Sequence, residues 1–169
     1  MAPLLSGCKG HTLPALPSEA SQQAKAKHEA ELSAQRLQIE QIPPPSKTRF
    51  MAVHNFDNWE NPYLTIQAGS MQLHVTLADA NATPYGQGGM LRPVGARRQL
   101  LTISPDKLGD AMTAIPLTAW PYGRVVAVEE AHKTPASAEP AVRRTMESVV
   151  ATLSDLGIVV YDLNEGNLR

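Results

Sequence analysis

The chain has 169 residues, 43% hydrophobic and 18% charged, which fits one domain with a tail and excludes a chain that is disordered throughout. Its 15 basic and 16 acidic side chains leave a formal net charge of −1, so no broad positive field attracts nucleic acid. The lone cysteine excludes an internal disulfide and a multi-cysteine zinc site, and no apolar run reaches the roughly 18 residues of a membrane-spanning helix.

The cysteine closes the string Leu5-Ser6-Gly7-Cys8 near the N-terminus. This string resembles the lipobox that ends the signal peptide of bacterial lipoproteins. The resemblance implies that Cys8 is joined to diacylglycerol and anchors the chain at the periplasmic face of a membrane. A secretory signal has a basic start and an apolar stretch of about 7–15 residues, so we expect that a segment upstream of Met1 is missing. The alternative is a free thiol at an ordinary terminus of a cytoplasmic protein.

A tether and a helix are expected after Cys8. Residues 9–17 have the Gly, His and Pro content of a tether, so residues 1–17 are interpreted as a signal remnant and tether. Residues 18–42 are rich in Ala, Glu, Gln and Lys, which predicts a helical spacer with Ser18 as its N-cap. Its apolar stripe is thin, which favours a solvated spacer over a short coiled-coil or partner-docking helix.

Three consecutive prolines from Pro43 are expected to end this helix, because proline lacks the backbone donor that a helix requires. Residues 43–49 therefore predict an extended, Pro-rich linker. Every aromatic side chain lies at or beyond Phe50, so the core is expected in residues 50–169, as a single domain.

A β-hairpin is expected to open the domain. Apolar and polar residues alternate over residues 71–77, which predicts a half-buried strand, and residues 63–67 predict its partner. The pair Gly69-Ser70 suits the tight reversal between them. Residues 79–93 then predict a long loop that is rich in Gly and Pro.

The rest of the chain predicts three strands that alternate with two helices, each with one apolar face. In chain order they are strand 100–103, helix 105–115, strand 124–128, helix 140–156 and strand 158–161. Two consecutive strand–helix–strand units imply right-handed crossovers and at least partly parallel pairing. The sequence therefore predicts a small α/β domain of two or three layers, a hairpin followed by βαβαβ, with α+β as the alternative.

Two short strings carry a second resemblance. Tyr122-Gly123-Arg124-Val125-Val126 and Leu156-Gly157-Ile158-Val159-Val160, with the helix between them, are similar to the periplasmic domain of the biopolymer-transport accessory proteins of energy-transducing complexes. Those proteins also carry an N-terminal membrane helix with an intramembrane acid, which this sequence lacks. The resemblance implies a fold and not a function.

Polar side chains at the strand ends are the candidates for ligand binding. If the last three strands are parallel, their carboxyl ends meet at one edge of the sheet, where α/β folds generally bind ligands. The residues of this predicted ligand edge are Glu129, Glu130, His132, Asp162 and Glu165. The alternative is that they are solvated loop residues. The scattered histidines form no metal-binding motif, so no metal and no cofactor are predicted.

Trp59, Tyr63, Trp120 and Tyr122 form a predicted partner patch, because Trp and Tyr are enriched at protein interfaces. Packing in the core is the alternative.

The absence of a catalytic motif, the lipobox-like string and the spacer together favour a non-catalytic, membrane-tethered interaction or structural module of the bacterial cell envelope. Its partners would be a membrane, through a lipid anchor, and a protein of the envelope. The alternative function is a small ligand-binding or cation-binding domain, or an enzyme, that uses the ligand edge.

Overall fold

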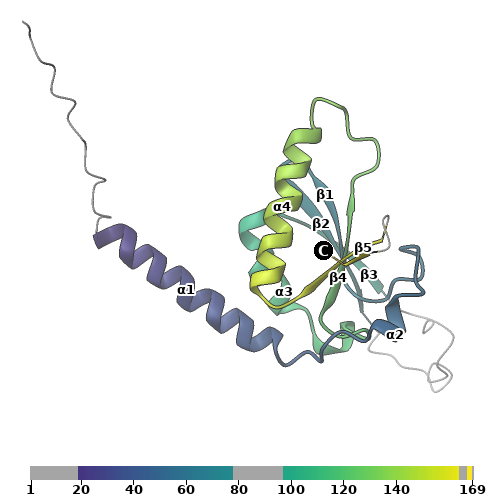
Figure 1. The fold of residues 1–169 in the computed structure, drawn as a ribbon, viewed down its shortest axis with the longest axis horizontal. Helices are drawn as coiled ribbons and strands as arrows, with labels where there is room; N and C mark the ends of the chain where they lie inside the picture. Colours follow the sequence, from purple (N-terminus) through teal and green to yellow (C-terminus); the bar gives the residue numbers. More distant parts are fainter. Residues whose placement is uncertain (1–18, 78–96, 164–166, 169) are drawn as a thin grey trace, which may run out of the picture.

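A computed structural model describes residues 19–77, 97–163 and 167–168, in which helices pack on a mixed β-sheet (Figure 1). In chain order the elements are α1 (Glu19–Ile39), α2 (Lys47–Phe50), β1 (Tyr63–Gln67), β2 (Ser70–Leu77), β3 (Arg97–Ile103), the 3-10 turn η1 (Pro105–Lys107), α3 (Leu108–Ala114), the 3-10 turn η2 (Leu117–Ala119), β4 (Val125–Glu130), α4 (Glu139–Asp155), β5 (Val159–Asp162) and β6 (Asn167–Leu168). The predicted small α/β domain is confirmed. Cys8, the loop predicted at 79–93 and Glu165 lie outside the described residues.

The strands of the described residues form one sheet in the order β3-β2-β1-β4-β5-β6. β1 is central: it pairs antiparallel with β2 and parallel with β4, which in turn pairs parallel with β5. β3 pairs antiparallel with β2, because it continues the hairpin as a meander. The chain then crosses over two strands, through α3, to reach β4. Of the last three predicted strands, β4 and β5 are therefore parallel neighbours, whereas β3 lies apart from them at an edge of the described sheet.

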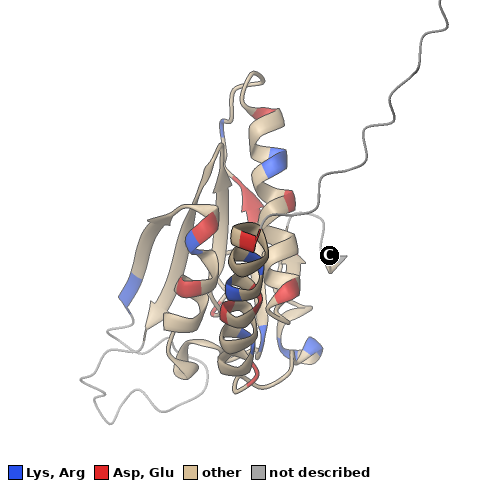
Figure 2. Ribbon diagram, turned by 90° about the vertical axis from the view of Figure 1, so that its left-hand side faces the viewer, with Lys and Arg blue, Asp and Glu red and all other residues tan. Residues whose placement is uncertain are grey.

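One face of the sheet is covered by α3, α4 and the last turns of α1 (Figures 1 and 2). On α4, Val142, Met146, Val149 and Leu153 are buried at the three- and four-residue spacing of one helix face. They pack on β-strand side chains such as Leu64. Gly157, with φ +77°, ends this segment in the left-handed conformation that glycine adopts without strain, so the chain can turn into β5.

The other face is covered over β1, β4 and β5 by α2 and the segment that follows it. Phe50 and Trp59 pack there on Tyr161, with ring centroids 5.4 and 5.6 Å apart. The predicted partner patch is wrong, because its four side chains are 1 to 8% exposed, Trp59, Tyr63 and Tyr122 on this face and Trp120 on the helix-covered face. Large aromatic surfaces contribute most when they are buried, and these rings form the core instead.

The predicted linker at 43–49 is bound to the domain. The Pro43 carbonyl accepts a hydrogen bond from the Arg124 amide (2.9 Å), and the Ser46 amide donates to the Tyr122 carbonyl (2.9 Å). Gly123, with φ +82°, lies against the prolines, where a Cβ atom would meet the Pro43 and Pro44 carbonyls. Proline lacks a backbone donor but keeps its acceptor, so this segment can pair with the start of β4. The boundary predicted near residue 49 is therefore not a boundary of the packed structure.

The buried side chain of Asn61 holds the start of β4 as well. Its side chain is 1% exposed, donates to the carbonyls of Gly123 (2.8 Å) and Val125 (2.7 Å), and accepts from the Tyr122 amide (2.8 Å). Three backbone groups that would otherwise be buried without a partner are satisfied in this way. The segment before β1 is thus locked to the start of β4.

Candidate functional site

Polar side chains meet at the carboxyl ends of β1 and β4, on the sheet face opposite α3 and α4. Thr65 is the register partner of Glu129 in the parallel pair, and Tyr63 is the register partner of His74 in the hairpin. Because side chains alternate between the two faces of a strand, these four residues lie on one face. His132, which follows β4, lies beside Glu129. We name Thr65, His74, Glu129 and His132 the Glu129 cluster.

Polar contacts join the members of the cluster in a row. Thr65 Oγ1 donates to Glu129 Oε1 (2.8 Å) and lies 3.2 Å from His74 Nε2, and the other Glu129 oxygen lies 3.6 Å from His132 Nε2. The Thr65 hydroxyl has a single proton, which forms the hydrogen bond to the Glu129 carboxylate. His74 must then donate from Nε2, which fixes its neutral tautomer.

Burial and charge act on the two rings beside this row. The Tyr63 and His74 rings are stacked, with centroids 4.1 Å apart. Burial lowers the pKa of His74 below its ordinary value of 6.5, and the Arg98 guanidinium lowers it further. Burial also raises the pKa of Tyr63; Arg98 opposes this rise, while the charges of Glu129 and Asp57 add to it. Both rings are therefore neutral near neutral pH.

The His74 shift predicts a pH dependence of stability. Below pH 6.5 the unfolded chain binds a proton at His74 more readily than the native protein does. The free energy of unfolding should therefore have its full value above this pH, and it should fall as the pH drops toward the lower native pKa of His74. His74→Gln should flatten this slope in urea unfolding measured between about pH 5 and 8. His28→Gln, at an exposed ring on α1 outside the cluster, is the control and should keep the wild-type slope. An unchanged slope in His74→Gln would contradict the prediction.

The predicted ligand edge is divided between the two faces of the sheet. Glu129 and His132 do lie together, but Glu130 is the register partner of Ile66, on the helix-covered face. Asp162 is buried on that same face, beside Val128. Neighbouring residues of a strand point to opposite faces, so acids that are adjacent in sequence cannot share one site. Within the described ranges, no group of three or more His, Cys, Asp or Glu side chains could hold a metal ion.

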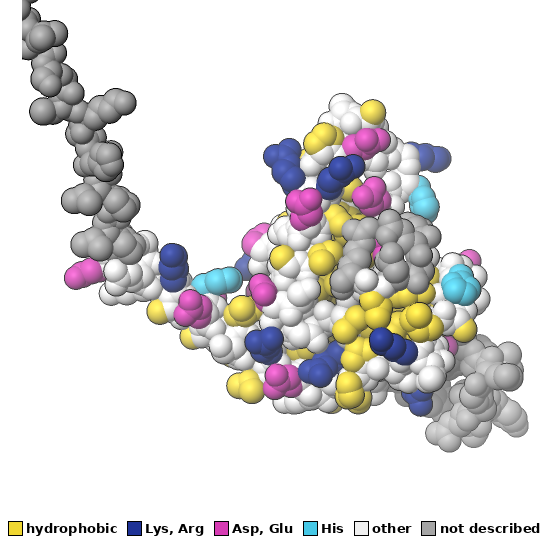
Figure 3. All heavy atoms as spheres, in the orientation of Figure 1, with side chains coloured by type: hydrophobic (Ala, Val, Ile, Leu, Met, Phe, Trp, Pro, Cys, Tyr) yellow, Lys and Arg dark blue, Asp and Glu magenta, His cyan; other side chains and the backbone are white. Residues whose placement is uncertain are grey.

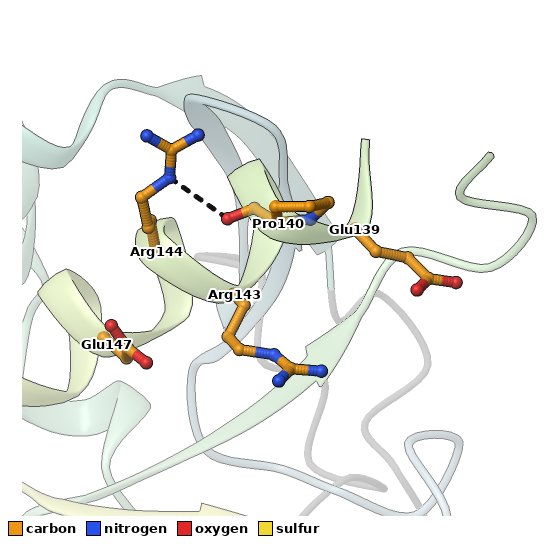
Figure 4. A pocket seen from close by; sticks show the side chains of 5 residues that line it. All are labelled: Glu139, Pro140, Arg143, Arg144 and Glu147. Carbon is orange, nitrogen blue, oxygen red and sulfur yellow. Dashed lines mark hydrogen bonds between the residues drawn. The ribbon is translucent and has the colours of Figure 1, made fainter. Parts of the chain in front are cut away.

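Two shallow hollows lie along α4. The first has a volume of about 340 Å³ and is lined by Glu139, Pro140, Arg143, Arg144 and Glu147, with Arg144 Nε donating to the Pro140 carbonyl (3.2 Å) (Figure 4). The second, of about 570 Å³, lies between α4 and Glu130. Their acidic and basic side chains are exposed and intermixed, as they are across the face in Figure 3. Neither hollow presents a field of one sign to a ligand.

The most exposed strand of the described sheet is β3. Its first six residues are all exposed, and Leu100 and Leu101, at its centre, are 57% and 47% exposed. Leu100 is the register partner of His74 and Leu101 that of Leu73, so one leucine lies on each face. Among the described residues β3 pairs with β2 alone. The sequence did not predict this feature, because an apolar run gives no sign of a strand's place in the sheet.

No family model, no curated protein and no solved structure matches the chain. Within the part of the chain that the structure describes, no helix is long and apolar enough to cross a membrane.

Proposed function

We propose that the protein is a non-catalytic interaction module, held at a bacterial membrane through Cys8, that binds an extended segment of a protein partner along β3. The observation that carries this proposal is the exposed, apolar centre of an edge strand. The free edge of a sheet offers backbone donors and acceptors to a further strand. Side chains on the two faces then select that strand, and here each face offers one leucine.

The shape of α1 supports the tethered part of the proposal. Its 21 residues span about 32 Å at 1.5 Å per residue, and the first three turns lie exposed to solvent. Only the C-terminal end is anchored, through Ile39 and, just beyond the helix, Ile42. Such a helix holds the domain at a distance from the surface to which its N-terminal side is attached.

Photo-crosslinking in bacterial cells tests the binding edge. A photoreactive phenylalanine analogue in place of Gln99 or Thr102, both exposed on β3, should give a crosslinked product of discrete mass. The same analogue in place of Ser148, exposed on α4, is the control and should give none. Products that are absent from β3, or equally abundant from α4, would overturn the proposed binding edge.

The anchor is tested in the same cells. The full chain, made behind a secretory segment, should sediment with the membrane fraction, and Cys8→Ser should move it to the soluble fraction. A chain whose distribution does not change with Cys8→Ser is not held through that residue.

A further inference from the structure

We propose that the segment bound along β3 is β3 of a second copy of this chain, paired antiparallel across a two-fold axis. The inference rests on the proposed function and names its partner. Pairing of this kind is isologous, so one strand must be complementary to itself when its direction is reversed. The residues of β3 meet this condition in both side-chain packing and charge.

Packing favours a two-fold axis close to Leu100, the middle residue of β3. In that register Leu100 of one copy faces Leu100 of the other, and Leu101 faces Gln99. Thr102 then faces Arg98, and Ile103 faces Arg97. Both exposed leucines lie at the centre of the joined sheet, and no two like charges face each other directly.

Charge favours the same arrangement. Antiparallel pairing brings the first residues of one β3 beside the last residues of the other, so Arg97 approaches the turn that holds Asp106 in the second copy. The Asp106 side chain is exposed and follows β3 by three residues. The two Arg98 side chains, in contrast, lie four residues apart along the strands, about 14 Å. That is beyond the screening length of about 8 Å at physiological salt, so their repulsion is weak.

The contact is small, since a single seven-residue strand on each side forms its centre. Small interfaces are typically weak and transient. Two copies held in one membrane meet at a far higher local concentration than two copies in dilute solution. We therefore expect dimers of the purified chain only at high concentration.

The test uses opposite charges at one position. Leu100→Lys and Leu100→Glu should each weaken dimerisation of the full chain at least about tenfold, because each places two like charges face to face across the two-fold axis. An equimolar mixture of the two variants should dimerise again, since lysine then faces glutamate. Sedimentation equilibrium over a range of concentrations measures all three samples, and circular dichroism checks that both variants fold.

Leu117 supplies the matched control, because it is 56% exposed, as Leu100 is, but lies in η2. Leu117→Lys and Leu117→Glu, alone or mixed, should dimerise as the wild type does. A wild-type chain that stays monomeric at all concentrations, or variants whose mixture is no stronger than either alone, would overturn the second copy as partner. The crosslinking experiment separates this failure from that of the proposed function: a product of twice the chain mass supports the second copy, and a β3 product of another mass keeps the binding edge with a different partner.

Discussion

Leu153→Asp is expected to unfold the protein. Leu153 is 0% exposed and lies in the last turn of α4, on the apolar face with which this helix covers the sheet. A carboxylate without a partner at this place costs several kcal/mol, which is comparable with the total stability of about 5–15 kcal/mol of an ordinary domain. Met146→Asp, at a side chain that is 4% exposed, should act in the same direction. Loss of the cooperative thermal transition, followed by circular dichroism, is the measurement.

Ser148→Asp is the matched control for this experiment. Ser148 lies on the same helix with its side chain exposed, so the new carboxylate stays in water. We expect a change in stability within about 0.5–1 kcal/mol. A stable Leu153→Asp variant would mean that α4 does not pack on the sheet as described.

Removal of residues 1–49 is expected to have the second largest effect, a fall in the midpoint of thermal unfolding of roughly 10 °C or more. The deletion takes away Ile39 and Ile42, which are 1% and 3% exposed, and each such side chain contributes about 1.5–3 kcal/mol when it is buried. It also removes the hydrogen bonds of Pro43 and Ser46 with the segment before β4. The chain keeps its sheet but loses part of the cover on both faces.

Removal of residues 1–31 separates this packing effect from a general effect of shortening. The described residues it deletes, 19–31, are almost all exposed, and the Lys27–Glu31 ion pair that it breaks is a surface pair of little energetic value. The midpoint should stay within a few degrees of that of the full chain. If removal of residues 1–49 had as small an effect, the end of α1 and the prolines would contribute nothing to stability.

Local patterns were enough to predict the larger elements of the fold, although α2 begins within the segment predicted as an extended linker and β6 was not predicted. Alternation over β2 and the three- and four-residue spacing on α4 are short-range signals, and both elements lie where the sequence placed them. The turn at Gly69, with φ +75°, is predicted in the same way, from a glycine between two strands. These features depend on residues that are close together in the chain.

Features that depend on distant partners were not predictable in this way. The strand order places β3 at an edge, and the residues of the strand itself do not indicate this position. The Glu129 cluster joins residues from β1, β2 and β4, so only the register brings Thr65 and His74 to Glu129. The prolines predicted a linker because a sequence shows at once that they lack backbone donors. It does not show which distant groups bond to their carbonyls.

The bonds of Asn61 have a kinetic consequence. They join residues 62 and 64 positions apart, and β1 pairs with β4 over a similar distance. Closing a loop of that length costs roughly 4 kcal/mol of chain entropy before any contact is gained. The hairpin of β1 and β2 closes over a few residues and can form before β4 arrives, so the edge of β1 that β4 later occupies is open during that interval. Sheets built from such distant pairings fold slowly, and exposed strand edges favour aggregation. The interval before β1 pairs with β4 is therefore the stage of folding at which this chain is most open to aggregation.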